Sequence, residues 1–129
     1  MAHVEEVGTE PDVQFVELAV EVFTMLADVT RVRLVLALRD HAELPVNRLA
    51  ELVGKAAPAV SQHLAKLRMA RMVTTRQDGT RVFYRLTDEH ATELVHAAIR
   101  QAEHTVDPVP KHHRRDPGTA GTTGPVVPA

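Results

Sequence analysis

The strongest structural constraint in this sequence is a two-residue turn, Asp78-Gly79, that separates two runs of β-forming residues. The runs cover residues 72–76 and 81–86 and are rich in Val, Thr, Phe and Tyr. An Asp-Gly pair between such runs is a strong local signal for a β-hairpin, because glycine accepts the positive φ that the tight turn needs. The sequence therefore predicts one hairpin beside the helices that the remaining apolar spacing indicates.

Five helices are predicted from apolar residues that recur at helical spacing. Thr30 is the expected N-cap of the second helix, Pro45 opens the third and Gly54 closes it. In chain order the first four predicted helices are 13–27, 30–40, 45–54 and 58–72, and Thr87 or Asp88 caps a fifth that runs to about residue 104. This order predicts a mainly α fold with a β-hairpin wing, a homodimeric winged helix-turn-helix. The two helices that span residues 45–72 form the helix-turn-helix, whose second helix enters the major groove.

Composition divides the chain into one domain and two flanking segments. We expect a flexible N-terminus at residues 1–11, a DNA-binding and dimerisation domain at 12–106, and a Pro/Gly-rich tail at 107–129. Cysteine is absent, which excludes disulfides and thiolate metal sites. No secretion signal or run long enough to span a bilayer is evident, so we expect a cytoplasmic protein without a membrane partner.

The charge is segregated along the sequence. The formal net charge of the chain is −2, yet residues 55–85 carry seven basic side chains and one acid, a net charge of +6. A local basic surface on a nearly neutral protein is typical of a domain that binds nucleic acid phosphates. A solvated surface without a partner is the alternative for this feature alone.

The fourth predicted helix has one apolar stripe, Val60, Leu64 and Leu67, which lie within about 40° of one another at 100° per residue. Its opposite side is polar in the first turns. Glutamine pairs with adenine, and serine and lysine contact bases or phosphates, whereas wing arginines contact the backbone or minor groove. We expect His63, on the flank, to be a partly buried imidazole rather than a base contact. The predicted DNA-binding residues are Pro58, Ser61, Gln62, Lys66, Arg76 and Arg81.

Three segments together resemble the ArsR/SmtB family of metal-responsive repressors: 26–31 (LADVTR), 58–67 (PAVSQHLAKL), and Asp78-Gly79 ahead of 83–86 (FYRL). The similarity covers about residues 13–113. The resemblance implies a homodimer that binds double-stranded operator DNA and blocks a promoter until an effector weakens this binding. The family pattern does not identify the inducer.

Within that family, the C-terminal region most resembles the actinobacterial KmtR-type nickel/cobalt sensors. The resemblance implies that histidines and one glutamate are the ligands, at His90, Glu103, His104, His112 and His113. One position departs from the family's ordinary fifth-helix zinc pattern, which has a histidine where this chain has Gln101. Scattered surface histidines and a solvated basic tail are the alternative to a metal site.

Helix geometry limits how such a site can form. His90 and His104 are 14 residues apart, which is about 21 Å along one helix. One helix cannot bring both side chains to the same ion, but two antiparallel copies that cross near Ala97 and Ala98 can. The spacing therefore predicts two symmetric sites at a dimer interface.

The favoured function is a transcriptional repressor whose apo dimer binds operator DNA and is released by Ni(II) or Co(II). An N/O ligand set without sulfur suits these ions, and Zn(II) binding is possible. The alternative is a zinc-responsive or metal-independent repressor of the same family. An enzyme is not expected, because the chain has no nucleophile motif or phosphate loop.

Overall fold

The computed structural model describes residues 12–106. The chain divides into two compact units, residues 1–95 and 96–129. Within the described residues, the first unit contains every element up to the first turns of the last helix, and the second contains the remainder of that helix. In the described range, none of the helices has the length and apolar character that crossing a membrane requires.

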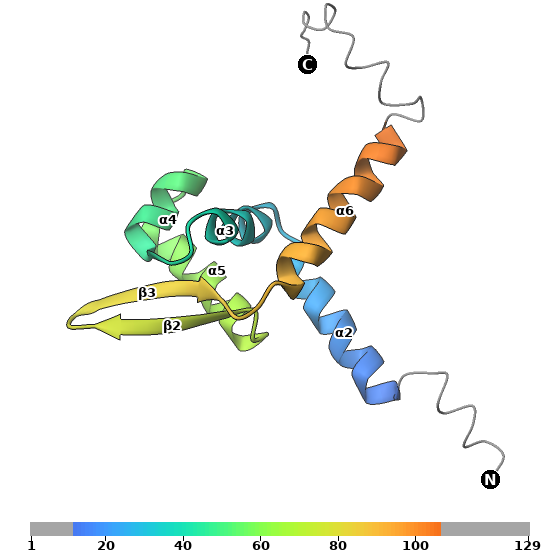
Figure 1. Ribbon diagram of the computed structural model, residues 1–129, viewed down its shortest axis with the longest axis horizontal. Coiled ribbons are helices and arrows are strands. Elements are labelled where there is room, and N and C mark those ends of the chain that lie inside the picture. The colour runs from blue at the N-terminus through green and yellow to red at the C-terminus, as the bar shows by residue number, and fades with distance from the viewer. Residues whose placement is uncertain (1–11, 107–129) are drawn as a thin grey trace, which may run out of the picture. The chain divides into compact units, whose positions relative to one another are not determined.

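The elements follow the predicted order, helices first, then hairpin, then helix (Figure 1). They are α2 (Val13–Leu26), α3 (Val29–Asp40), β1 (Leu44–Pro45), α4 (Val46–Val53), α5 (Ala57–Met69), β2 (Val73–Asp78), β3 (Arg81–Leu86) and α6 (His90–Val106). The mainly α winged helix-turn-helix fold is thus confirmed, with α4 and α5 as the helix-turn-helix.

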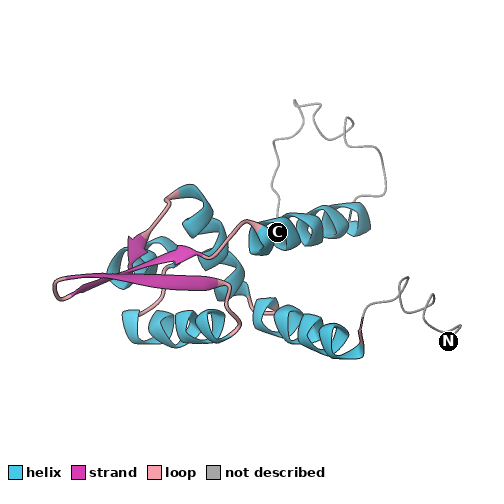
Figure 2. Ribbon diagram, turned by 60° about the horizontal axis from the view of Figure 1, so that its bottom comes forward, coloured by secondary structure: helices cyan, strands magenta, loops and turns pink. Residues whose placement is uncertain are grey.

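The wing is a three-stranded antiparallel sheet in the order β1-β3-β2. Strands β2 and β3 pair from Val73 opposite Leu86 to Asp78 opposite Arg81, with Gly79 at φ 67° in the turn. Figure 2 shows this ribbon extending from the helices of the first unit. Strand β1 was not predicted, because two residues that pair with β3 across the sequence leave no periodic pattern.

Helix ends agree with the prediction at α4 and differ at α3. Pro45 is the N-cap of α4, and Gly54 closes it in the left-handed conformation at φ 68°. The expected cap of the second helix was wrong: Asp28, not Thr30, caps α3, since its side chain accepts a hydrogen bond from the Arg31 backbone N–H. Thr30 lies inside the helix and is buried.

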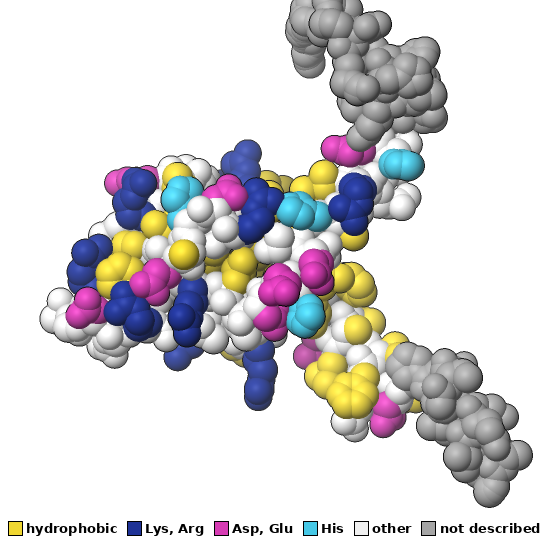
Figure 3. Space-filling model, in the orientation of Figure 1, with side chains coloured by type: hydrophobic (Ala, Val, Ile, Leu, Met, Phe, Trp, Pro, Cys, Tyr) yellow, Lys and Arg dark blue, Asp and Glu magenta, His cyan; other side chains and the backbone are white. Residues whose placement is uncertain are grey.

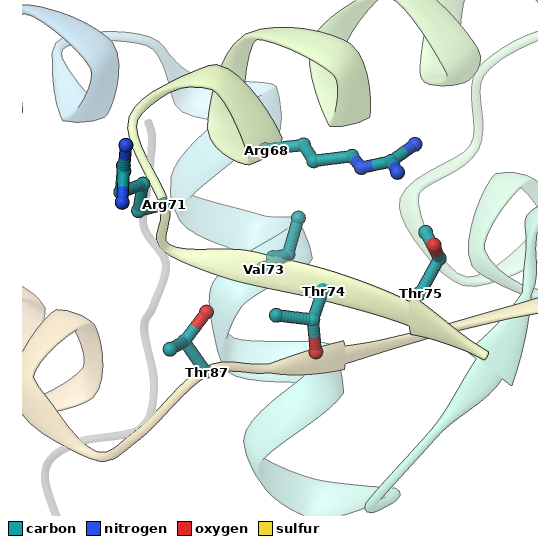
Figure 4. A pocket seen from close by; sticks show the side chains of 6 residues that line it. All are labelled: Arg68, Arg71, Val73, Thr74, Thr75 and Thr87. Carbon is teal, nitrogen blue, oxygen red and sulfur yellow. The ribbon is translucent and has the colours of Figure 1, made fainter.

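Helix α5 ends at Met69, three residues before the predicted end. The chain turns at Arg71, whose φ of 63° is left-handed, and the Met72 N–H then donates to the Leu67 carbonyl over 2.9 Å. This bond satisfies a carbonyl of the last helical turn, as in the usual glycine-ended helix. Figure 4 shows Arg71 at this turn into β2.

The core lies between α3, α4, α5, the start of β2 and the first turns of α6. The apolar stripe predicted on α5 is confirmed, because Val60, Leu64 and Leu67 are each 0% exposed. Burial of a leucine or valine side chain contributes about 1.5–3 kcal/mol, so this stripe fixes which side of α5 faces outward.

Candidate nucleic-acid interface

The outward side of α5 carries the side chains predicted to contact DNA. Pro58, Gln62 and Lys66 are exposed opposite the buried stripe, and Ser61 is exposed on its flank. No hydrogen bond to another described residue occupies the Gln62 or Lys66 side chain. In a single chain these four residues are therefore open to solvent. We call them the recognition face.

The wing arginines lie beside one aromatic ring. The guanidinium carbons of Arg76 and Arg81 are 4.8 Å and 5.0 Å from the centroid of the Phe83 ring. Such contacts orient a guanidinium without removing its charge. Figure 3 shows Lys and Arg side chains over this part of the molecule.

Arg76 also pairs with an acid that sequence inspection did not single out. Its Nε donates to both carboxylate oxygens of Glu43, at 3.2 and 3.1 Å, and its Nη2 donates to Oε2 at 2.6 Å. This bidentate pair lowers the pKa of Glu43 and raises the pKa of Arg76. Arg81 has no such recorded carboxylate partner in the described residues, so the two wing arginines differ in the charge they offer.

His63, on the flank of α5, is partly buried, as the sequence predicted; its side chain is 26% exposed. Its Nδ1 lies 3.0 Å from Nη1 of Arg31 and 3.7 Å from Oδ2 of Asp28. The Arg31 backbone N–H and the neighbouring charges lower the pKa of Asp28, so this carboxyl stays ionised. The N-cap carboxylate at Asp28, three residues before an arginine, was the signal in the sequence that was missed.

Two further basic residues of the 55–85 segment lie away from the recognition face. Figure 4 shows the Arg68 and Arg71 side chains extending in different directions where α5 turns into β2. With Val73, Thr74, Thr75 and Thr87 they line an open cavity of about 430 Å³. The positive charge of the segment is thus spread over more than one surface.

The candidate metal ligands on α6 are exposed in one chain: His90, Glu103 and His104. The His90 backbone N–H donates to Oδ1 of Asp88, two residues before the helix begins, and His90 Nδ1 lies 3.5 Å from Oε1 of Glu93. His112 and His113 lie outside the described residues. Among residues 12–106, no three His, Cys, Asp or Glu side chains gather closely enough to hold a metal ion.

Helix α2 exposes a large apolar surface, which sequence analysis did not single out. The residues concerned are 48–69% exposed: Val13, Phe15, Val16, Leu18, Val20 and Phe23. Hydrophobic side chains gather on this helix in Figure 3. These side chains are spread around much of the helix, and an exposed apolar surface of this extent marks an interaction surface.

Comparison with known proteins now decides the family. Residues 28–75 match the model described as "Bacterial regulatory protein, arsR family". The HTH-type transcriptional regulator KmtR of Mycobacterium tuberculosis is 61% identical over 104 residues, 81% of this chain and 78% of that protein. The chain belongs to the ArsR family. The HTH-type transcriptional repressor SmtB of the same species is 35% identical over 92 residues, 71% of this chain and 67% of that protein.

Solved structures agree with this membership. The crystal structure of NolR from Sinorhizobium fredii matches with a TM-score of 0.61 and 28% identity, over 69% of this chain and 92% of that one. The homodimeric winged helix-turn-helix DNA-binding domain of Mb0332 from Mycobacterium bovis matches in fold, with a TM-score of 0.67 at 22% identity, over 78% of this chain and 94% of that one. This ArsR-family chain is a transcriptional regulator with a DNA-binding fold, and not an enzyme.

Proposed function

We propose that this ArsR-family regulator is a metal-responsive repressor. Its apo homodimer binds double-stranded operator DNA in the cytoplasm, and Ni(II) or Co(II) at an α6 dimer interface releases the DNA. The observation that carries the proposal is on α6, where His90, Glu103 and His104 are exposed. Within residues 12–106 no further side chains lie close enough to them to complete a metal site. Ligands from a second chain, and from the tail, would supply the missing donors.

Operator contact is assigned to the recognition face and the wing. Ser61 and Gln62, in the first turns of α5, are placed to meet base edges when this helix enters the major groove. Lys66 and Arg81 would contact phosphates, and Pro58 would lie against the backbone. The Arg76 guanidinium is already paired with Glu43 and would have to share its donors with the DNA. We therefore assign Arg76 a smaller contribution to DNA binding than Arg81.

Dimer formation is supported by the apolar face of α2. Side chains such as Phe15 and Phe23, 60% and 58% exposed, would remain in water in a single chain. Each fully buried side chain of this size gains about 1.5–3 kcal/mol. A second copy of the chain is the occupant we propose for this face, in keeping with the two-fold symmetry of a repressor and its operator.

The donor set fits the proposed ions. Imidazole nitrogen and carboxylate oxygen suit Ni(II), Co(II) and Zn(II), and the absence of cysteine excludes a thiolate site. The three α6 residues supply three donors, or four if the Glu103 carboxylate is bidentate, which is enough for a tetrahedral ion, whereas His112 and His113 raise the set to five residues and favour an ion of higher coordination. Asp88 and Glu93, near His90, are candidates to hold that ring in position.

The test is a titration of the purified protein with Ni(II), Co(II) and Zn(II), with absorption and operator binding followed in parallel. The probe is a duplex that the metal-free protein selects from a random-sequence pool. We expect Ni(II) or Co(II) to bind and to weaken DNA binding, with reciprocal weakening of metal binding by DNA. Release by Zn(II) alone would favour the zinc alternative, and no release by any metal would overturn the metal-responsive proposal.

A further inference from the structure

A cluster of three polar side chains joins the recognition helix to the helices that precede it. Arg31 on α3 is 9% exposed, and its Nε donates to the Met25 carbonyl in the last turn of α2. Its Nη1 bonds to His63 on α5 over 3.0 Å. Asp28, which caps α3, accepts from the Arg31 backbone N–H over 3.0 Å. One guanidinium therefore contacts α2 and α5 from its place on α3.

The chemistry of arginine fixes the state of the histidine. A guanidinium has only donors and stays charged, so the ring nitrogen that faces it must accept. A bond from Arg31 to Nδ1 therefore requires the neutral ring with its proton on Nε2. The proton pattern follows from the bond itself, because an imidazolium would place a second cation against Arg31.

We propose that His63 is a positioning residue for operator binding, which acts through Nδ1 by holding α5 against Arg31. His63 lies one residue after Gln62 and directly before the buried Leu64, so its bond adds to the buried stripe in holding the turn that carries the recognition face. Since Arg31 also holds the end of α2, the cluster links the apolar helix to α5. The inference rests on the proposed recognition face.

The first test needs no DNA. Nitrogen-15 NMR of the apo protein labelled in histidine distinguishes the two neutral tautomers and the imidazolium, and His63→Asn assigns the signal. We expect His63 to be the Nε2–H tautomer at pH 7.5. An Nδ1–H tautomer or an imidazolium would overturn the proposal even if the protein binds DNA as expected.

The second test uses two amides that mimic different ring nitrogens. The Asn oxygen takes the place of Nδ1 and can accept from Arg31, whereas the Gln side-chain end takes the place of Nε2. We expect His63→Asn to bind the selected duplex within about threefold of wild type and His63→Gln to bind at least about tenfold more weakly. The opposite order would assign His63 to a base contact through Nε2, and equal affinities of the two variants would show that Nδ1 does not position α5.

Removal of the other partner provides an independent check. Arg31→Met should weaken operator binding at least as much as His63→Gln, because it also removes the bond to the Met25 carbonyl, and the double variant should be no weaker than Arg31→Met alone. The salt dependence of binding should stay at the wild-type slope, because a buried guanidinium contacts no phosphate. Additive losses or a reduced slope would contradict the shared bond. If wild type selects no duplex, the proposed function fails while the NMR result still decides the tautomer.

Discussion

The helix-turn-helix and the C-terminal half of α6 differ in how far one chain completes them. In the first region, each helix is fixed by partners in the same chain: α5 buries Val60, Leu64 and Leu67 completely and bonds to α3 through His63. In the second, residues 97–106 are all exposed, and no candidate ligands within residues 12–106 form a cluster that could hold a metal ion. The DNA-binding part is thus complete within one chain, whereas the proposed metal site needs ligands from the tail or from a second chain.

The largest expected effect comes from separating the two chains of the proposed dimer. Phe15→Glu together with Phe23→Glu would place two carboxylates on the apolar face of α2, which costs too much to bury without a partner. We expect a folded monomer in sedimentation experiments and a loss of about 10²–10⁴-fold in operator affinity, since two linked half-site contacts become one.

Leu52→Glu is the matched control for this double variant. Leu52 is also an exposed apolar residue, 43% exposed, but lies on α4. It should leave the protein dimeric. A dimer in both cases would show that α2 is not the surface that joins two copies, and would leave α6 to do so alone.

The second-largest expected effect concerns the tail ligands of the proposed metal site. Replacing His112 and His113 with Ala should reduce Ni(II) or Co(II) affinity by at least about 100-fold and abolish metal-driven release, because two of five proposed donors are lost. Apo folding and apo operator affinity should remain at wild-type values, and any Zn(II) bound through α6 should persist.

X-ray absorption of the metal-bound wild type checks the same point from the metal side. Five or six N/O neighbours are expected, with water in any remaining position. His41→Ala controls for the loss of a histidine elsewhere. A four-coordinate spectrum, or a double variant that nickel still releases from DNA, would exclude the tail from the site and favour the zinc alternative.

The sequence predicted the elements whose signals are local. The Asp78-Gly79 turn, the Gly54 helix end and the apolar stripe of α5 each depend on a few neighbouring residues, and the structure confirms all three. These local signals were enough to order the helices and the hairpin into a winged helix-turn-helix.

One miss was local: Asp28 caps α3 through a bond to the Arg31 backbone N–H, so its signal was present in the sequence. The other misses lie where distant residues decide. Glu43 pairs with Arg76 across 33 residues, and β1 exists only through β3. The metal set on α6 could be listed from the resemblance, but its assembly depends on chain segments and copies beyond the described residues.

A third effect divides base recognition from phosphate contact within the DNA-binding region. Gln62→Ala should cost about 1–3 kcal/mol on the selected duplex and relax the preference at one base pair. Arg81→Ala should weaken binding to all duplexes alike and reduce the salt slope by about one. Binding to selected and randomised duplexes at several salt concentrations measures both. If neither variant changes affinity, the recognition face is wrongly assigned.

The smallest effect concerns the end of α5, where an arginine occupies a left-handed position. Arg71 adopts φ 63°, a left-handed conformation that costs an L-residue about 1–2 kcal/mol and glycine almost nothing. Arg71→Gly should therefore unfold at higher temperature than Arg71→Ala, which also lacks the guanidinium but keeps the strained backbone. After the larger chain entropy of unfolded glycine is subtracted, we expect a difference of about 1 kcal/mol, or about 4–8 °C in a domain of this size. Equal melting temperatures would show that the turn relaxes without cost, and a further loss of operator affinity common to both variants would place the Arg71 guanidinium at the DNA.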